Sequence, residues 1–182
     1  MTAQKLTDLT ATTASPLDTD IILVTEDPAG DPVSKKTTMA NALRLAHGYV
    51  QVTGGSASQS LSATTWTKVS QFTAELNYDA RTTASHSDDS IILVNAGRYM
   101  ADWMCSFTGA TTSEYRLAVY WNGSIQCVPA ITTTTSTNEH CVTVRVPVNA
   151  SSANQKVEAY VYSDGANAFA VKESVLTVER VA

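Results

Sequence analysis

The chain has 182 residues, of which 43% are hydrophobic and 16% charged, and its formal net charge is -5. This composition predicts a folded chain with one sizeable core, or a smaller domain with an appendage. The basic residues are scattered singly along the sequence, which argues against nucleic-acid binding. No apolar run approaches the roughly 18 residues that span a bilayer, and the opening "MTAQKLTDLT" lacks the apolar segment of a secretory signal. We therefore expect a protein made in a cytoplasm, without a membrane or nucleic-acid partner.

The N-terminal part predicts a small hairpin followed by a short helix. The aliphatic run from Ile21 to Val24 is bounded by acidic residues and predicts a strand. Two prolines and a glycine in "EDPAGDP" predict a reversal, after which residues 33–38 return as the second arm. In "MANALRLA", Met39, Leu43 and Ala46 share one helical face. This unit, residues 1–48, is too small to bury a core of its own.

A linker is predicted over residues 49–65. The stretch "QVTGGSASQSLSATT" is small, polar and contains two adjacent glycines, which is typical of a linker or of an extended segment held by a partner. The main domain is therefore expected to cover residues 66–182.

From Trp66 onward the apolar residues alternate with a period of two, which predicts strands. Three runs each have an inward set, namely Tyr99, Ala101, Trp103, Cys105 and Phe107; Tyr115, Leu117, Val119 and Trp121; and Val142, Val144, Val146 and Val148. Asn122-Gly123 predicts a type I′ hairpin turn, because both central residues of that turn need positive φ. Pro147 cannot donate to a ladder, so its strand is expected near an edge.

The last two-thirds of the chain thus predict at least seven short strands and no helix. "KVEAYVYS" alternates Val157, Ala159 and Val161 against two tyrosines, and "SVLTVERV" closes the chain. The polar stretches "NYDARTTASHSDDS" and "ITTTTSTN" have no periodic apolar face and are expected to be loops. The predicted fold is mainly β, an antiparallel β-sandwich preceded by a hairpin and helix.

Groups that carry chemistry are sparse, and no catalytic, cofactor or metal site is expected. His47, His86 and His140 have no Ser or Cys nucleophile in a recognisable turn nearby. The acidic residues around the first strand lack the spacing of a calcium loop. The three cysteines, Cys105, Cys127 and Cys141, are best interpreted as small reduced residues, although a disulfide between the last two stays open.

Large side chains on the faces opposite the inward sets are the most informative feature. Met100 and Met104 lie on one predicted strand, and Tyr160 and Tyr162 lie on another. Methionine is over-used at contact surfaces and tyrosine is enriched at interfaces. A scatter of exposed apolar groups is the alternative, since every protein has some. Four large side chains on matching faces favour an oligomer interface.

The order of strands resembles the jelly roll of the tumour necrosis factor family and of the complement globular heads. The residues that carry the resemblance are Gly97-x-Tyr99 opening a long strand after "SIILVNA", the strand ending at Asn122-Gly123, "KVEAYVY", and the terminal strand. The resemblance covers roughly residues 66–182 and implies a trimer. Mapped onto such a trimer, the axis is expected to be lined by Met100, Met104, Tyr160, Tyr162, Leu176 and Val178.

The N-terminal stretch resembles the leading segment of many bacteriophage virion proteins, including tail-fibre and head-fibre proteins. The shared elements are a Leu-Thr-x-Leu opening, an Asp before a short aliphatic strand, a turn, and Lys-Lys-x-Thr before a short helix. The resemblance implies an attachment element that buries apolar side chains against another virion protein, namely Leu6, Leu9, Ile21, Ile22, Leu23, Val24 and Leu43.

Together these features predict a non-enzymatic structural protein of a phage particle. We expect a trimeric capsid decoration protein, a cement or head-fibre protein, bound to the major capsid or another virion protein and assembled in the host cytoplasm. The alternative is a short tail-fibre or baseplate receptor-binding protein that contacts host carbohydrate or protein through Trp66, Tyr78, Arg81 and His86. An enzyme would need a paired-carboxylate or Ser-His arrangement, which the sequence does not offer.

Overall fold

The structure is a computed structural model, which describes residues 21–26, 33–38, 47–52, 58–77, 81–126, 130–133 and 139–181. The chain divides into two compact units, residues 1–44 and 45–182, and each is described by itself. All elements in the described part are strands, so the mainly β prediction is confirmed. The helix predicted in "MANALRLA" lies outside the described residues.

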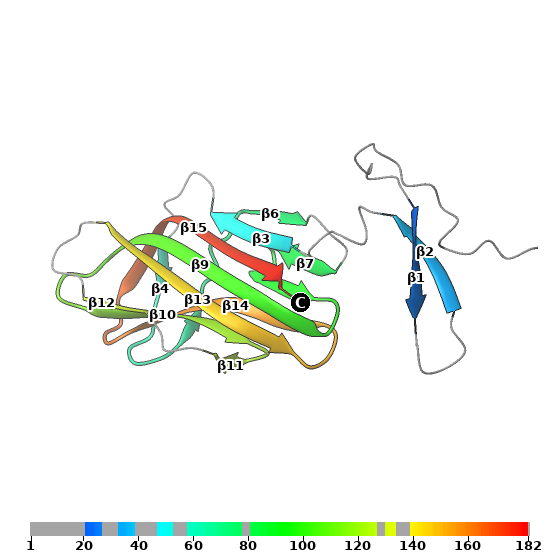
Figure 1. Ribbon diagram of the computed structural model, residues 1–182. Helices are drawn as coiled ribbons and strands as arrows, with labels where there is room; N and C mark the ends of the chain where they lie inside the picture. Colours follow the sequence, from blue (N-terminus) through cyan, green and yellow to red (C-terminus); the bar gives the residue numbers. More distant parts are fainter. Residues whose placement is uncertain are drawn as a thin grey trace, which may run out of the picture. The chain divides into compact units, whose positions relative to one another are not determined.

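The first unit contains a single hairpin in its described part. Strand β1 (Ile21–Glu26) pairs antiparallel with β2 (Val33–Thr38), with Ile21 opposite Thr38 and Glu26 opposite Val33 (Figure 1). The hairpin predicted from the aliphatic run and the proline-rich reversal is thus present. It forms a two-stranded sheet.

The second unit is a sandwich of two antiparallel sheets, shown in Figure 1. The six-stranded sheet has the order β13, β9, β15, β3 and β6, with β4 pairing off β15. Its strands are β3 (His47–Val52), β4 (Ser58–Ser60), β6 (Ala74–Asn77), β9 (Gly97–Gly109), β13 (His140–Ala150) and β15 (Ala168–Arg180). Pro147 lies on β13, which is an edge strand as predicted.

The seven-stranded sheet has the order β11, β10, β14, β8 and β7. Two further strands join it, since β12 pairs with β10 and β5 pairs with β14. The strands are β5 (Thr67–Lys68), β7 (Thr82–Ser85), β8 (Ser90–Leu93), β10 (Glu114–Trp121), β11 (Ser124–Ile125), β12 (Ala130–Thr133) and β14 (Gln155–Ser163). Strands β10 and β14 therefore have neighbours on both sides.

The core between the sheets is built from the inward sets that the alternation predicts. Its largest fully buried side chains include Trp103, Tyr99, Tyr115, Phe107 and Phe169. The Phe107 and Phe169 rings lie 4.7 Å apart, and both also contact the Tyr115 ring. Burying a side chain of this kind stabilises the fold by about 1.5–3 kcal/mol, so this one contiguous core accounts for a large share of the domain's stability.

Polar atoms of the core aromatic residues are all paired. The Tyr99 hydroxyl donates to the Asn95 carbonyl oxygen at 2.9 Å, and the Tyr115 hydroxyl donates to that of Ala168 at 2.8 Å. The half-buried Trp121 donates its Nε1–H to Gln155 Oε1 at 2.8 Å. These bonds avoid the free-energy cost of leaving a polar atom unpaired in the core.

The hairpin turn predicted at Asn122-Gly123 is confirmed. Both residues have positive φ, 48° at Asn122 and 78° at Gly123, and they connect β10 to β11. Asn and Gly adopt this region with the least strain, so the sequence fixes the turn type locally.

The structure differs from the linker expected over residues 49–65. Strand β3 contains residues 49–52 of that range and pairs with β15, and Leu61 is buried in the core. The boundary between the two units falls after Arg44 instead. The buried alternation of Gly48, Val50 and Val52 is the physical cause, since it gives the segment one core-facing side despite its polar neighbours. The polar stretch expected as a loop before "IILV" likewise contains β7.

Candidate functional surfaces

The outer face of the six-stranded sheet, here called the β9 face, consists of outward side chains on β13, β9, β15 and β3. Strand register aligns them in rows: Thr143, Met104, Val175 and Gln51 in one, and Arg145, Asp102, Thr177 and Tyr49 in the next. Met104 is 53% exposed, a large fraction for an apolar side chain on a central strand. Arg145 Nε lies 3.5 Å from Asp102 Oδ1, so the charges of the second row are paired.

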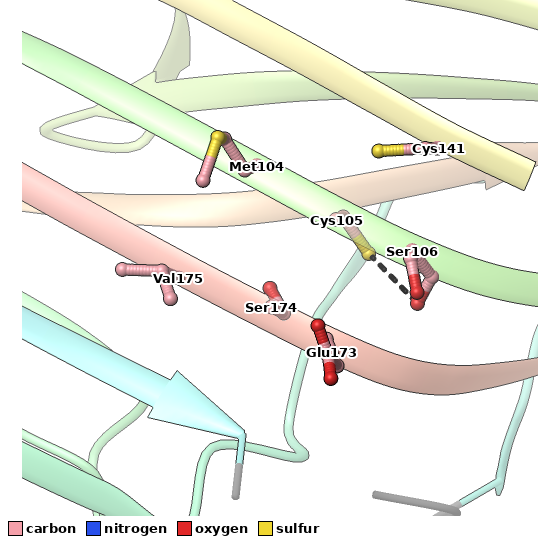
Figure 2. A pocket seen from close by; sticks show the side chains of 7 residues that line it. All are labelled: Met104, Cys105, Ser106, Cys141, Glu173, Ser174 and Val175. Carbon is pink, nitrogen blue, oxygen red and sulfur yellow. Dashed lines mark hydrogen bonds between the residues drawn. The ribbon is translucent and has the colours of Figure 1, made fainter.

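A shallow pocket of about 130 Å³ opens on the β9 face (Figure 2). It is lined by Met104, Cys105, Ser106, Cys141, Glu173, Ser174 and Val175, from three adjacent strands. The pocket lies beside a β-bulge, where the register between β9 and β15 shifts between Val171 and Glu173. Burial raises the pKa of the Cys105 thiol to about 12, so this cysteine stays protonated and unreactive.

The structure divides the predicted trimer residues among three places. Met100 and Met104 lie on the β9 face as expected, Met100 half-buried and Met104 exposed. Tyr160 and Tyr162 lie on β14 in the opposite sheet, so they do not share a face with the methionines.

Leu176 and Val178 are fully buried in the core, so the expectation that they point to an axis is wrong. The bulge is the cause. Phe169 and Val171 are buried before it and Ser174 after it, so one extra residue reverses which side chains of β15 face the core.

The outer face of the seven-stranded sheet carries a cluster of Trp66, Tyr120, Tyr160 and Tyr162, here called the aromatic face. The Tyr120 and Tyr160 rings stack at 3.9 Å, and Trp66 lies 5.9 Å from Tyr120 and 5.6 Å from Tyr162. The Arg116 guanidinium lies 5.0 Å from the Tyr162 ring centroid, within the range of a cation–π contact. All four aromatic side chains are half-buried.

Ala118 shows how closely these rings cover the sheet. It lies between Arg116 and Tyr120 on β10, opposite Tyr160 on β14, and alternates with the inward Leu117 and Val119. An outward alanine would normally be exposed, yet Ala118 is fully buried and is not part of the sandwich core. Burial raises the pKa of Tyr120 and of Tyr160 for the same reason, because a partly desolvated phenol loses its proton less easily.

Charged residues around the aromatic face are paired with each other. Lys68 Nζ lies 2.6 Å from Glu158 Oε1 and also donates to the Asp88 carbonyl oxygen at 2.6 Å. Arg116 pairs with Glu114 through its Nε. The surface is therefore close to neutral, although the whole chain is acidic.

The residues predicted for receptor contact do not form one group. Trp66 belongs to the aromatic face. His86 lies in the turn between β7 and β8, where its Nδ1 is 3.0 Å from Glu75 Oε2. Arg81 directly precedes β7, and Tyr78 lies outside the described residues.

Tyr120 and Arg116 are not among the residues predicted from the sequence, although "EYRLAVYW" places them opposite its inward set. Tyr120 contacts Trp66, and Arg116 contacts Tyr162. The alternation of the sequence shows that both side chains point outward, but it does not show that Trp66 reaches Tyr120 across β14.

The histidines are separated in the fold. His47 begins β3, His86 lies in the β7–β8 turn and His140 begins β13. Within the described ranges, no group of three or more His, Cys, Asp or Glu side chains is placed to hold a metal ion. The described part of the chain also contains no helix long and apolar enough to cross a membrane.

All seven predicted virion-anchor residues fall in the first unit, residues 1–44. Ile21, Ile22, Leu23 and Val24 form part of β1. Leu6, Leu9 and Leu43 lie outside the described residues.

Comparison with solved structures identifies the fold. The Eiger TNF of S. frugiperda aligns with a TM-score of 0.52 and 11% identity, over 76% of this chain and 92% of that one. Murine APRIL, in a crystal structure at pH 5.0, aligns with a TM-score of 0.50 and 11% identity, over 76% of this chain and all (100%) of that one. At such low identity the likeness establishes the fold alone. The second unit is a jelly-roll sandwich of the kind seen in these proteins, as its strand order predicts.

The PRD1 vertex protein P5 is similar at a TM-score of 0.45 and 18% identity, over 75% of this chain and 97% of that one. This score is too low to add to the assignment. No protein-family model matches the sequence, and a search of curated proteins finds no match.

Proposed function

We propose that this protein is a non-enzymatic structural component of a bacteriophage particle. In this proposal the first unit attaches the protein to the particle and the jelly-roll unit forms a trimeric head, as in a capsid decoration or head-fibre protein. The observation that carries the proposal is the division of the chain into a jelly roll with its own core and a small N-terminal unit.

The hairpin β1–β2 supports an attachment role. Its two strands make a sheet of their own, and a two-stranded sheet is only marginally stable in water without further packing. The run Ile21 to Val24 supplies apolar side chains that such packing would bury. Binding to a partner on the particle would therefore also stabilise the hairpin.

The β9 face supports trimerisation. The resemblance to the tumour necrosis factor family implies a trimer, and the jelly-roll unit has an exposed methionine at the centre of one sheet. Met104 and Val175 are directly opposite each other across β9 and β15, and the pocket beside them can receive a side chain of a neighbouring copy. We therefore place the proposed trimer interface on the β9 face, in place of the six residues that the sequence predicts for the axis.

Attachment is tested by deleting residues 1–44, the first unit, and mixing the truncated and full-length proteins with phage particles that lack the protein. The full-length protein should sediment with the particles, and the truncated protein should remain in the supernatant while keeping its oligomeric state. Co-sedimentation of the truncated protein would contradict the attachment role.

Trimerisation is tested by light scattering coupled to gel filtration. Met104→Arg places a charge in the centre of the β9 face and should reduce the mass to that of a monomer. Ile125→Arg is the matched control, because Ile125 is 41% exposed and lies on β11 in the other sheet. A wild-type monomer, or a trimer that Met104→Arg leaves intact, would contradict the proposal.

A second candidate, a receptor-binding protein of the tail or baseplate, is supported by the aromatic face. Competition between the purified protein and infecting phage tests it, because a pure decoration protein should not compete.

A further inference from the structure

The aromatic face has unused hydrogen-bonding capacity, unlike the aromatic residues of the core. Tyr99, Tyr115, Trp103 and Trp121 all donate to a partner. Within the part of the chain that the structure describes, the side chains of Trp66, Tyr120, Tyr160 and Tyr162 make no hydrogen bond. They contact one another and Arg116 through their rings. Three hydroxyls and one indole N–H therefore remain free for a ligand.

Each ring of the aromatic face packs against at least one other side chain of the face. Trp66 contacts two tyrosines, Tyr120 stacks on Tyr160, and Arg116 lies against Tyr162. Such contacts restrict the rotamers of the rings before a ligand arrives, which lowers the entropic cost of binding. The face is thus preorganised, with apolar ring surface and polar tips side by side.

Charge narrows the class of ligand. Both cations beside the face, Lys68 and Arg116, are already paired with carboxylates, Glu158 and Glu114. An anionic ligand would have to displace these pairs and would meet a chain of net charge -5. The complementary partner is a neutral one.

The strand arrangement disfavours a peptide. Strands β10 and β14 have neighbours on both sides, so they offer no free edge for strand addition. Ala118, which lies opposite Tyr160 between the rings, is fully buried, so it offers no apolar contact to a peptide side chain. A pyranose ring needs neither feature, because its C–H face packs on aromatic rings and its hydroxyls bond to groups at the rim.

We propose that the aromatic face, formed by Trp66, Tyr120, Tyr160 and Tyr162, binds neutral carbohydrate. The sugar ring packs on the exposed aromatic surface, the tyrosine hydroxyls and the Trp66 N–H bond to sugar hydroxyls, and the two ion pairs border the site. The binding surface lies on the sheet opposite the β9 face. It therefore shares no residue with the face proposed for trimerisation.

The test is affinity electrophoresis of the full-length protein in native gels containing dextran, mannan or galactan, with dextran sulfate as the anionic comparison. At least one neutral polymer should retard the protein. Trp66→Ala and Tyr162→Ala should each raise the dissociation constant for that polymer about tenfold. Leu76→Ala, at an exposed leucine on β6 of the other sheet, should not change it. Tyr162→Phe keeps the ring and removes only the hydroxyl, so it should weaken binding severalfold without disturbing the fold.

The proposal is overturned if no neutral polymer retards the protein or if dextran sulfate alone does. It is equally overturned if the alanine variants, shown to be folded by thermal unfolding, bind as the wild type does, or if a decaproline peptide binds the face and the polymers do not. None of these outcomes depends on particle binding, and each variant is compared with wild type in the same oligomeric state.

Discussion

Trp103 on β9 donates its indole Nε1–H to the Ser174 hydroxyl on β15 at 2.8 Å, and both side chains are buried. This bond joins the two longest strands of the six-stranded sheet beside the β-bulge. It pairs the N–H of the largest core side chain at the point where the pairing of β9 with β15 is irregular.

Replacing the acceptor of this bond should be costly. Ser174→Ala leaves a buried N–H without a partner, which should lower the free energy of unfolding by about 1–3 kcal/mol. In urea denaturation this loss of stability should appear as a lower midpoint with an unchanged slope. Ser70→Ala, at an exposed serine, is the control. Equal midpoints for the two variants would show that Trp103 does not depend on this acceptor.

Gly109, the last residue of β9, should not accept a side chain. A Cβ atom built there would lie 2.5 Å from Cε2 of the Tyr115 ring, and that ring is buried and held by its hydroxyl. Gly109→Ala should therefore destabilise the domain by about 1–3 kcal/mol, as other overpacked positions do. Thermal unfolding measures the effect against Thr108→Ala at the preceding, half-buried position. A melting temperature equal to that of the control would mean that Tyr115 moves aside freely.

The two described cysteines should differ in reactivity. Burial raises the pKa of the Cys105 thiol to about 12, whereas Cys141 is exposed on β13. At neutral pH, iodoacetamide should alkylate Cys141 in the folded protein and Cys105 only after unfolding, because the thiolate is the reactive form. Peptide mass spectrometry separates the two sites. Similar labelling rates in the folded state would contradict the burial of Cys105.

Asp89 should make stability depend on pH. Burial raises its pKa above the usual value of 3.8 for an aspartate, although the Phe72 N–H donates to its Oδ1 at 3.2 Å. The folded state thus holds a proton that the unfolded state has lost, so this residue's contribution to stability is present below pH 3.8 and declines as the pH rises through the folded pKa.

Asp89→Asn keeps an acceptor for Phe72 and cannot ionise. The stability of the variant relative to wild type should therefore increase as the pH rises above 3.8. Urea denaturation of both proteins across this range measures the difference. A constant difference at all pH values would show that Asp89 has an ordinary pKa.

Much of the sandwich was predictable because each long strand has one face in the core. Alternation identified the inward residues of β9, β10, β13 and β14, and Asn122-Gly123 identified a turn by its need for positive φ. These are local properties, which the sequence expresses directly.

The candidate surfaces were less predictable because they depend on pairing between distant strands. Alternation separates inward from outward residues but does not say which sheet a strand joins, so Tyr160 and Met104 were grouped although they lie on opposite sheets. The bulge on β15 changes the alternation by one residue, and no glycine or proline in "AFAVKESVLTVER" marks it. The position of Leu176 could be determined only from the pairing of β15 with β9.

The opposition of the two outer faces also constrains any assembly of this protein. In the proposed trimer, copies that pack through the β9 face would turn their aromatic faces away from the symmetry axis, so the proposed carbohydrate sites would lie on the perimeter. Three equivalent sites at one height could engage neighbouring chains of a surface polymer together, and several weak contacts would then act as one strong attachment. The same arrangement would separate the residues of the proposed trimer interface from those of the proposed carbohydrate site, so that each set could change without the other.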